Sequence, residues 1–188
     1  MKPGVRALGI AESFREERST LAGAVVTASR VVDGFEFSSC TVGGTDATDA
    51  IRSLHADLDR EDVQYLLLAG IALAWYNVVD VRKLARAADR PVISISFEAS
   101  EGLEPALRRE FEGEALDRRL ATYRSLPSRR AAVVNGQTRY LRSVGLDHEE
   151  AVTVVDAFTP EGGRPEPVRV ARQAARAADA YARRITDA

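Results

Sequence analysis

Two short apolar runs with a helical pattern between them constrain the fold of this chain more than any other feature. The runs are Val63–Leu68 and Val92–Phe97. The segment between them, Val78–Ala88, has helical spacing and is followed by the helix-breaking Arg90-Pro91. Short apolar runs are typical of strands buried on both faces, as in parallel sheets covered by helices. The order therefore predicts a strand–helix–strand unit with two central, parallel strands.

The residues before this unit predict an antiparallel sheet followed by a helix. Three runs with apolar or alternating residues, joined by short connections, indicate consecutive strands at Arg6–Ala11, Leu21–Ala28 and Gly34–Val42. Thr45 or Asp46 can cap the helix that follows, in which apolar residues recur at helical spacing.

The C-terminal part of the chain predicts a hairpin between helices. Suitable patterns follow in the order Asp117–Ser125 (helix), Arg130–Val134 and Thr138–Ser143 (strands), Glu149–Phe158 and 167–184 (helices). Asn135-Gly136 between the two strands is a strong signal for a tight turn. In Ala99–Glu114, Glu, Gly and Pro interrupt any regular pattern, so we expect a loose loop there. Residues 1–188 thus predict one α/β domain with a mixed sheet, antiparallel in its first three strands and then parallel, flanked by helices.

Composition restricts what such a domain can do. Hydrophobic residues are 45% of the 188 and charged residues 29%, as in ordinary soluble domains. The net charge is only −2, so any face that binds nucleic acid must be local. The single cysteine, Cys40, excludes an internal disulfide, and two histidines are too few for a Cys/His zinc site. The apolar runs are too short for a membrane span and no leader pattern is visible, so we expect a cytoplasmic protein without membrane contact.

Four acidic residues are candidates to converge at one edge of the sheet. Glu12 and Glu98 lie at the ends of predicted strands, and Asp46 and Asp49 lie in the first turn of a predicted helix. Strand ends on one edge of such a sheet share a crevice in which ligands commonly bind. The simpler interpretations are that Asp46 caps its helix and that Glu12 and Glu98 are solvated loop residues.

Several residues near these carboxylates are candidates for contacts with phosphates and bases. Gly43-Gly44 is a flexible segment before a helix, which suits an anion but equally fits a tight turn. An exposed Trp75 could stack on an unpaired base. The alternative is that Trp75 packs its loop against the sheet, with Asn77 and Asp80 capping the next helix.

A rigid, basic segment near the C-terminus adds candidate phosphate contacts. Prolines at positions 165 and 167 fix the backbone before a helix. Arg164, Arg169 and Arg172 are the candidate contacts, because planar guanidinium groups suit phosphate oxygens. The alternative is a Pro-initiated helix with a solvated face.

Five segments carry a resemblance to a known family: Gly9–Phe14, Thr41–Asp49, Leu68–Asp80, Val92–Glu98 and the Pro-Glu-Pro segment at 165–167. Together they resemble the UPF0215 (DUF99) family, whose members look like endonuclease V, an enzyme that nicks nucleic acid beside deaminated adenine. The resemblance covers nearly the whole chain and implies a ribonuclease H-like, endonuclease V-like fold. It also implies a site in which carboxylates hold Mg²⁺ or Mn²⁺.

Taken residue by residue, the resemblance implies an altered site. The carboxylate of the first strand falls near Ala11 or Glu12, and the helix carboxylate falls near Asp49. The carboxylate expected after the fourth strand falls at Ala69, which has no ligand atom. A lysine of the family falls near Glu98, which reverses its charge.

A second departure concerns the segment that separates the strands at the lesion in endonuclease V. The corresponding stretch, Thr41–Gly44, has neither an aromatic residue nor a proline. The resemblance therefore implies a degenerate or rearranged metal-dependent nuclease site, with Glu12, Asp46 and Asp49 as the metal ligands.

We expect a protein that engages DNA or RNA, with endonuclease activity either rearranged or lost. One alternative is a non-catalytic nucleic-acid-binding module that uses the same edge and the C-terminal arginines. The other is a small-molecule nucleotide or phosphate enzyme that uses the same crevice, with Gly43-Gly44 as its anion site.

Overall fold

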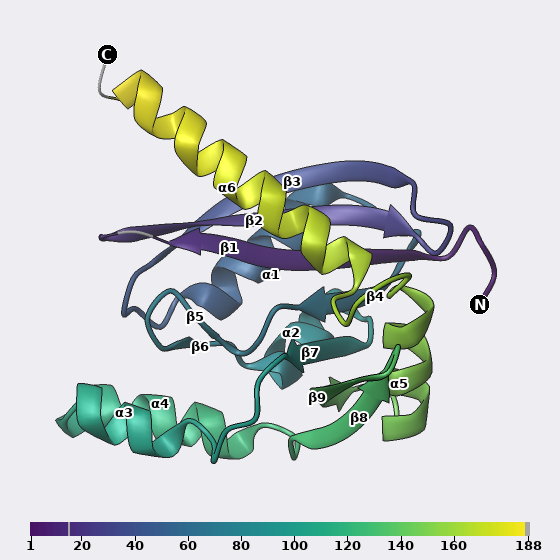
Figure 1. Cartoon of the computed structure of the whole chain (residues 1–188). Coiled ribbons are helices and arrows are strands. Elements are labelled where there is room, and N and C mark those ends of the chain that lie inside the picture. Colours follow the sequence, from purple (N-terminus) through teal and green to yellow (C-terminus); the bar gives the residue numbers. More distant parts are fainter. Residues whose placement is uncertain (15, 187–188) are drawn as a thin grey trace.

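A seven-stranded mixed sheet with helices on both faces organises the chain (Figure 1). The computed structural model describes residues 1–14 and 16–186. The sheet has the order β3-β2-β1-β4-β7-β9-β8. Its strands are β1 (Arg6–Phe14), β2 (Arg18–Thr27), β3 (Val32–Thr41), β4 (Val63–Leu68), β7 (Val92–Ser96), β8 (Arg130–Val134) and β9 (Gln137–Val144).

The central strands have the directions that the sequence predicts. β1, β4 and β7 are parallel, whereas β2 and β3 on one side and β9 and β8 on the other run antiparallel to their neighbours. β4 coincides with the predicted run Val63–Leu68, and β7 ends one residue before the predicted Phe97. Helices cover both faces of these strands, which is why their sequences are apolar rather than alternating.

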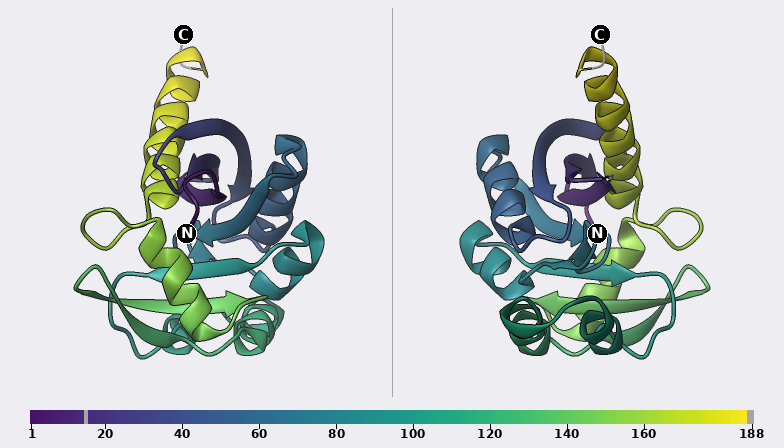
Figure 2. Two further views of the ribbon diagram at one scale, coloured as in Figure 1. Left: turned by 90° about the vertical axis from the view of Figure 1, so that its right-hand side faces the viewer. Right: turned by 90° about the vertical axis from the view of Figure 1, so that its left-hand side faces the viewer.

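Two pairs of helices cover the two faces of the sheet (Figure 2). One pair, α1 (Ala47–Leu58) and α2 (Val81–Ala88), packs on the face that carries Leu8 and Leu66. The other pair is α5 (His148–Ala157) and α6 (Glu166–Thr186), on the opposite face. Within residues 1–14 and 16–186, no helix combines the length and the apolar character that crossing a membrane requires.

Close packing of α6 on β1 places the Pro-Glu-Pro segment. Side chains of β1 alternate, so that Leu8 faces α1 while Ala7 and Ala11 face α5 and α6. Gly9 lies directly under the start of α6, and a Cβ there would overlap the backbone of Pro167. The small residues of β1 thus allow the α6 backbone to rest on the strand.

Two short elements depart from the sequence predictions. The predicted loose loop Ala99–Glu114 contains α3 (Glu104–Glu110), because Pro105 suits a first helical turn and Leu107 is buried against the core. α4 (Gly113–Ser125) follows and starts earlier than predicted. The predicted helix at 78–88 starts only at Val81, because a small hairpin, β5 (Ala72–Leu73) and β6 (Asn77–Val78), precedes it.

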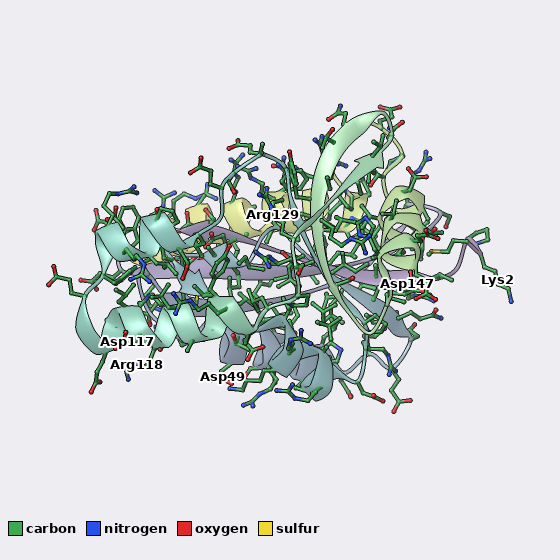
Figure 3. The ribbon with its side chains drawn as sticks, turned by 90° about the horizontal axis from the view of Figure 1, so that it is seen from below. Lys2, Asp49, Asp117, Arg118, Arg129 and Asp147 are labelled. Carbon is green, nitrogen blue, oxygen red and sulfur yellow. The ribbon has the colours of Figure 1, made fainter. Side chains whose placement is uncertain are left out.

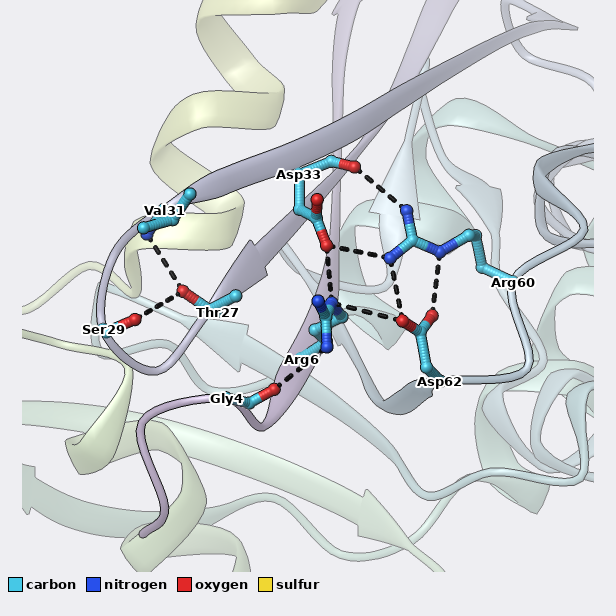
Figure 4. Close-up of polar contacts among 8 residues, drawn as sticks. All are labelled: Gly4, Arg6, Thr27, Ser29, Val31, Asp33, Arg60 and Asp62. Atoms are coloured by element: carbon cyan, nitrogen blue, oxygen red, sulfur yellow. Dashed lines mark hydrogen bonds and ion pairs between the residues drawn. The ribbon is translucent and has the colours of Figure 1, made fainter.

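A cluster of four charged side chains holds the start of β1 (Figure 4). Asp33 Oδ2 accepts from Arg6 Nε at 2.5 Å and from Arg60 Nη2 at 2.8 Å, and Arg60 Nε contacts Asp62 Oδ1 at 2.8 Å. Hydrogen bonds from Arg6 and then Arg60 lower the pKa of Asp33. The cluster joins the starts of β1 and β3 to the turn before β4, so its role is structural.

Candidate nucleic-acid interface

A cavity of about 390 Å³ lies where β4 and β7 end. The segments that follow these strands, 69–72 and 96–100, form part of its wall. Much of the remaining wall of the cavity is formed by Tyr123 of α4, Arg129, Arg142 of β9 and Arg164. The carboxyl ends of parallel strands are the usual place for ligands in sheets of this kind.

Arginines stacked on aromatic rings line this cavity. The guanidinium carbon of Arg164 lies 3.9 Å from the ring centre of Phe97. That of Arg129 lies 4.0 Å from the ring centre of Tyr140, and that of Arg142 lies 5.2 Å from the ring centre of Tyr123. Such walls offer both cationic donors for phosphate and flat surfaces for a base.

The three cavity arginines differ in how far the protein occupies their donors. Arg129 donates to the carbonyls of Glu98 and Ser100, and Arg142 donates to the carbonyl of Pro127. In the part of the chain that the structure describes, Arg164 makes no hydrogen bond or ion pair. Arg164 is therefore the cavity arginine with the most donors left for a ligand.

Further arginines surround Arg164 on the α6 side. Burial is the largest cause that lowers the pKa of Arg164, followed by the charges of Arg172, Arg139 and Arg176. None of these four forms an ion pair with a described carboxylate. We call Arg139, Arg164, Arg172 and Arg176 the α6 arginine cluster. It is a local positive region on a chain whose net charge is −2.

The carboxylate of Glu12, a predicted site residue, accepts hydrogen bonds from protein groups, one of them in the loop that continues from residues 69–72 of the cavity wall. Its Oε2 accepts from the Ser19 hydroxyl at 2.7 Å and from the Ala74 N–H at 2.8 Å. Burial raises the pKa of Glu12, and these two hydrogen bonds partly offset the shift. Glu12 thus fixes the loop that continues from the cavity wall.

Asp46 precedes α1 but its side chain does not cap the helix, which corrects the capping interpretation. Its carboxylate accepts from the Thr41 hydroxyl at 2.9 Å and from Asn77 Nδ2 at 2.7 Å. Burial raises the pKa of Asp46, but these hydrogen bonds outweigh it and leave the pKa below its usual value. In the alternative interpretation of the Trp75 loop, Asn77 and Asp80 both cap α2. Asp80 does so, whereas Asn77 accepts from the Ala47 N–H at 3.0 Å.

The other two predicted carboxylates, Asp49 and Glu98, have different partners and surroundings. Asp49 contacts Lys83 Nζ at 2.9 Å and Arg52 at 3.5 Å, beside α1 and α2 and away from Arg129 (Figure 3). Glu98 is exposed and lines the cavity. Among the residues that the structure describes, no three His, Cys, Asp or Glu side chains gather as metal ligands do. The structure therefore does not bring Glu12, Asp46 and Asp49 together as a preformed metal site.

The predicted anion cradle at Gly43-Gly44 has its N–H groups occupied. The Gly43 N–H donates to Ala74 O at 2.7 Å and the Gly44 N–H donates to Thr41 O at 3.1 Å. Arg119 donates to the carbonyls of both glycines. Gly43 has φ +68°, so glycine is needed there for the turn. The segment acts as a tight turn in this conformation.

Of the predicted nucleic-acid contacts, Arg164 and Arg172 belong to the α6 arginine cluster, whereas Arg169 pairs with Glu166 at 2.5 Å. Trp75 is 50% exposed. Sequence reasoning missed Arg129 and Arg142 of the cavity. The alternation of β9 was a usable signal, since it places Tyr140 and Arg142 on one face of the strand.

Comparison with known proteins agrees with this architecture. Residues 3–179 match the protein family described as "Endonuclease dU". A UPF0215 protein from Pyrobaculum calidifontis is 34% identical over 169 residues, which cover 88% of this chain and 92% of the relative. The crystal structure of a protein of unknown function from Archaeoglobus fulgidus has a TM-score of 0.81 at 28% identity, covering 92% of this chain and 96% of that one.

Endonuclease V structures share the fold. The enzyme from Ciona intestinalis, in complex with DNA containing an inosine, has a TM-score of 0.63 at 13% identity and covers 92% of this chain and 84% of that one. The fold is therefore the endonuclease V-like α/β fold that the sequence resemblance implies. Within it, the chain belongs to the family described as endonuclease dU, and the predicted UPF0215 relationship is confirmed.

Proposed function

We propose that this chain is an endonuclease that binds nucleic acid through the basic cavity and acts on strands containing deoxyuridine. The observation that carries the proposal is the cavity at the ends of β4 and β7, with Arg164 stacked on Phe97. Its volume of about 390 Å³ falls within the range of small-ligand sites, about 300–1,000 Å³. The name of the family supports deoxyuridine, and the Ciona relative in complex with DNA supports nucleic acid.

The chemistry of the cavity suits one nucleotide taken out of a strand. Enzymes that act on bases unstack the target nucleotide and hold its base against aromatic or apolar groups. Phe97 and Tyr123 supply rings here, and Arg164 supplies donors for a phosphate. The α6 arginine cluster continues the positive surface beyond the cavity and would follow the strand's backbone.

A bound cation remains a prediction for this chain. The described carboxylates do not form a cluster that fits Mg²⁺ or Mn²⁺ by itself, because Glu12 and Asp46 bond to protein groups and Asp49 pairs with Lys83. Mg²⁺ is often held by one or two carboxylates together with substrate phosphates. Glu98 supports this possibility, because among the four predicted carboxylates it is the one that lines the cavity.

A non-catalytic binding module is the second candidate. The specific observation in its favour is that the Glu12 and Asp46 carboxylates are used to position the backbone and side chains around them. Such a module would bind the same strands without cutting them, with an affinity that falls steeply as salt rises.

The experiment uses labelled oligonucleotides that carry one deoxyuridine, one inosine or only normal bases. Each is incubated single- and double-stranded with Mn²⁺, Mg²⁺ or EDTA and analysed on native and denaturing gels. We expect the deoxyuridine strand to be retarded and, with a cation, cut. Arg164→Ala should weaken binding about tenfold, an effect of about 1.4 kcal/mol. Arg86→Ala, at an exposed position of α2, removes the same charge and should change binding little.

The outcomes separate the candidates. Retarded strands that stay intact under every cation condition would establish the binding module. Loss of cleavage in Glu98→Gln with unchanged binding would show that the Glu98 carboxylate takes part in the cutting step. Absence of both binding and cleavage would overturn the proposal, and stabilisation of the protein by deoxyuridine monophosphate would then favour the nucleotide enzyme.

A further inference from the structure

Three consecutive residues of the β5–β6 turn have left-handed backbone conformations. The φ angles are +40° at Ala74, +58° at Trp75 and +57° at Tyr76. None of them is glycine, and residues with side chains are strained in this region. Such strain persists only where the surrounding structure imposes it, and it clusters at functional sites.

Contacts from three other parts of the fold hold this turn. The Ala74 N–H donates to Glu12 Oε2 at 2.8 Å. The carbonyl of Ala74 accepts from the Gly43 N–H at 2.7 Å, and the carbonyl of Tyr76 accepts from Arg119 Nε at 3.3 Å. The turn therefore has its backbone groups fastened by β1, by the turn before α1 and by α4.

With its backbone held in this way, the turn leaves the side chain of Trp75 partly exposed to solvent. Trp75 is 50% exposed, while Ala74 beside it is 1% exposed. One edge of the Trp75 ring is braced by Tyr76, with 5.4 Å between ring centres, and Tyr76 in turn meets Phe111 at 6.2 Å. The braced Trp75 ring therefore has half of its surface open to solvent, where it can contact a ligand.

We propose that Trp75 stacks on an unpaired base of the nucleic acid that enters the cavity. The inference rests on the proposed function and adds a second base contact to it. Residues 69–72 of the loop line the cavity and the same loop carries Trp75 a few residues later, so one strand can meet both. Aromatic side chains bind single strands by stacking on successive bases without reading their sequence. Glu12 then acts as a positioning residue that holds the turn.

The test uses the fact that Trp75 is the one tryptophan of the chain. A dye-labelled single strand with deoxyuridine is titrated with protein in EDTA. The anisotropy of the dye reports binding, and the fluorescence of Trp75 in a parallel titration reports stacking. We expect quenching of Trp75 with the same midpoint as the anisotropy change. Trp75→Ala should bind about ten- to a hundredfold more weakly, as for one lost stacked base, and Trp75→Phe should retain much of the affinity.

The readouts separate the inference from the proposed function. Binding with an unchanged Trp75 signal, together with wild-type affinity in Trp75→Ala, would overturn the stacking role and leave the cavity as the site. No anisotropy change at all would overturn both. Because the wild-type fluorescence needs no substitution, the inference is decided even where Trp75→Ala fails to fold.

Discussion

Glu12 illustrates how one carboxylate can serve either a cation or the protein itself. The same oxygen, Oε2, accepts from Ser19 and from Ala74. A carboxylate that binds a cation gives its oxygen lone pairs to the cation. A side chain that only accepts a hydrogen bond from a backbone N–H needs an oxygen in the right place but no charge. Glutamine retains the acceptor and removes the charge, so it separates the two roles.

We predict that Glu12→Gln raises the free energy of unfolding at neutral pH. Burial raises the pKa of Glu12 in the folded protein, so the folded state binds the proton more tightly than the unfolded state. Wild-type stability therefore falls as pH rises from about 4.3, the unfolded value, through the raised folded value, and then levels off. The Glu12→Gln variant has no ionisable group at this position, so its stability does not fall for this reason. Urea unfolding at pH 4 and pH 7.5 should show a gain for Glu12→Gln only at the higher pH.

Glu12→Ala is the matched comparison. It removes the acceptor and leaves the Ala74 N–H without its partner, at a cost of about 1–3 kcal/mol. Stability should fall at both pH values. A Glu12→Gln protein that is less stable than wild type at pH 7.5 would contradict our account of the charge.

The sequence identified Glu12 and Asp46 as candidates but not their partners. Ala74 is 62 positions from Glu12 and Asn77 is 31 positions from Asp46, so no local pattern reports these contacts. The same holds for the stacking of Arg164 on Phe97. A charge can be read from a sequence, whereas the group that neutralises or fixes it depends on the tertiary fold.

Among the secondary-structure elements, α6 depends on one position of β1. Gly9 faces the backbone of Pro167, which cannot move aside as a side chain could. We predict that Gly9→Ala destabilises the protein by about 3 kcal/mol or more, at the upper end for overpacked cores. Gly4→Ala is the control, since nothing lies within 4 Å of its added Cβ. Urea midpoints of the two variants give the comparison, and equal midpoints would disprove the close contact.

Asn77 joins β6 to the start of α1. It accepts from the Ala47 N–H and donates to Thr41 O and Asp46 Oδ1, and it is fully buried. We predict that Asn77→Ala costs about 3 kcal/mol, because buried groups on both sides lose their partner. Thermal unfolding should show the loss, and Thr153→Ala, which removes one exposed helical hydrogen bond, should change little.

Element types were easier to predict than element boundaries. β4 was predicted to the residue: its run begins directly after two acidic residues, 61 and 62, and Gly70 follows two positions after its last residue. The prediction of a loose loop at 99–114 was wrong because α3 spans only Glu104–Glu110 and is too short to show a helical period in the sequence. The β5–β6 turn had no sequence signal either, since its left-handed residues are not glycine.

At the scale of the whole molecule, charge is distributed unevenly. At the start of β1, Arg6 and Arg60 are balanced by Asp33 and Asp62. Near the cavity, the α6 arginine cluster has no described carboxylate as an ion-pair partner. A net charge of −2 therefore conceals a basic region that can follow a nucleic-acid backbone.

Salt dependence of binding tests this distribution directly. Each phosphate contact releases condensed counterions, so the slope of log K against log salt changes by about 0.7 per contact on a single strand. We predict that Arg172→Ala combined with Arg176→Ala lowers the magnitude of the slope by about 1.4, the sum for two contacts. Arg86→Ala should leave it unchanged, because Arg86 lies on α2, on the opposite face of the sheet. An equal decrease per removed arginine in both variants would show that binding depends only on the overall charge, and that α6 provides no defined path for the backbone.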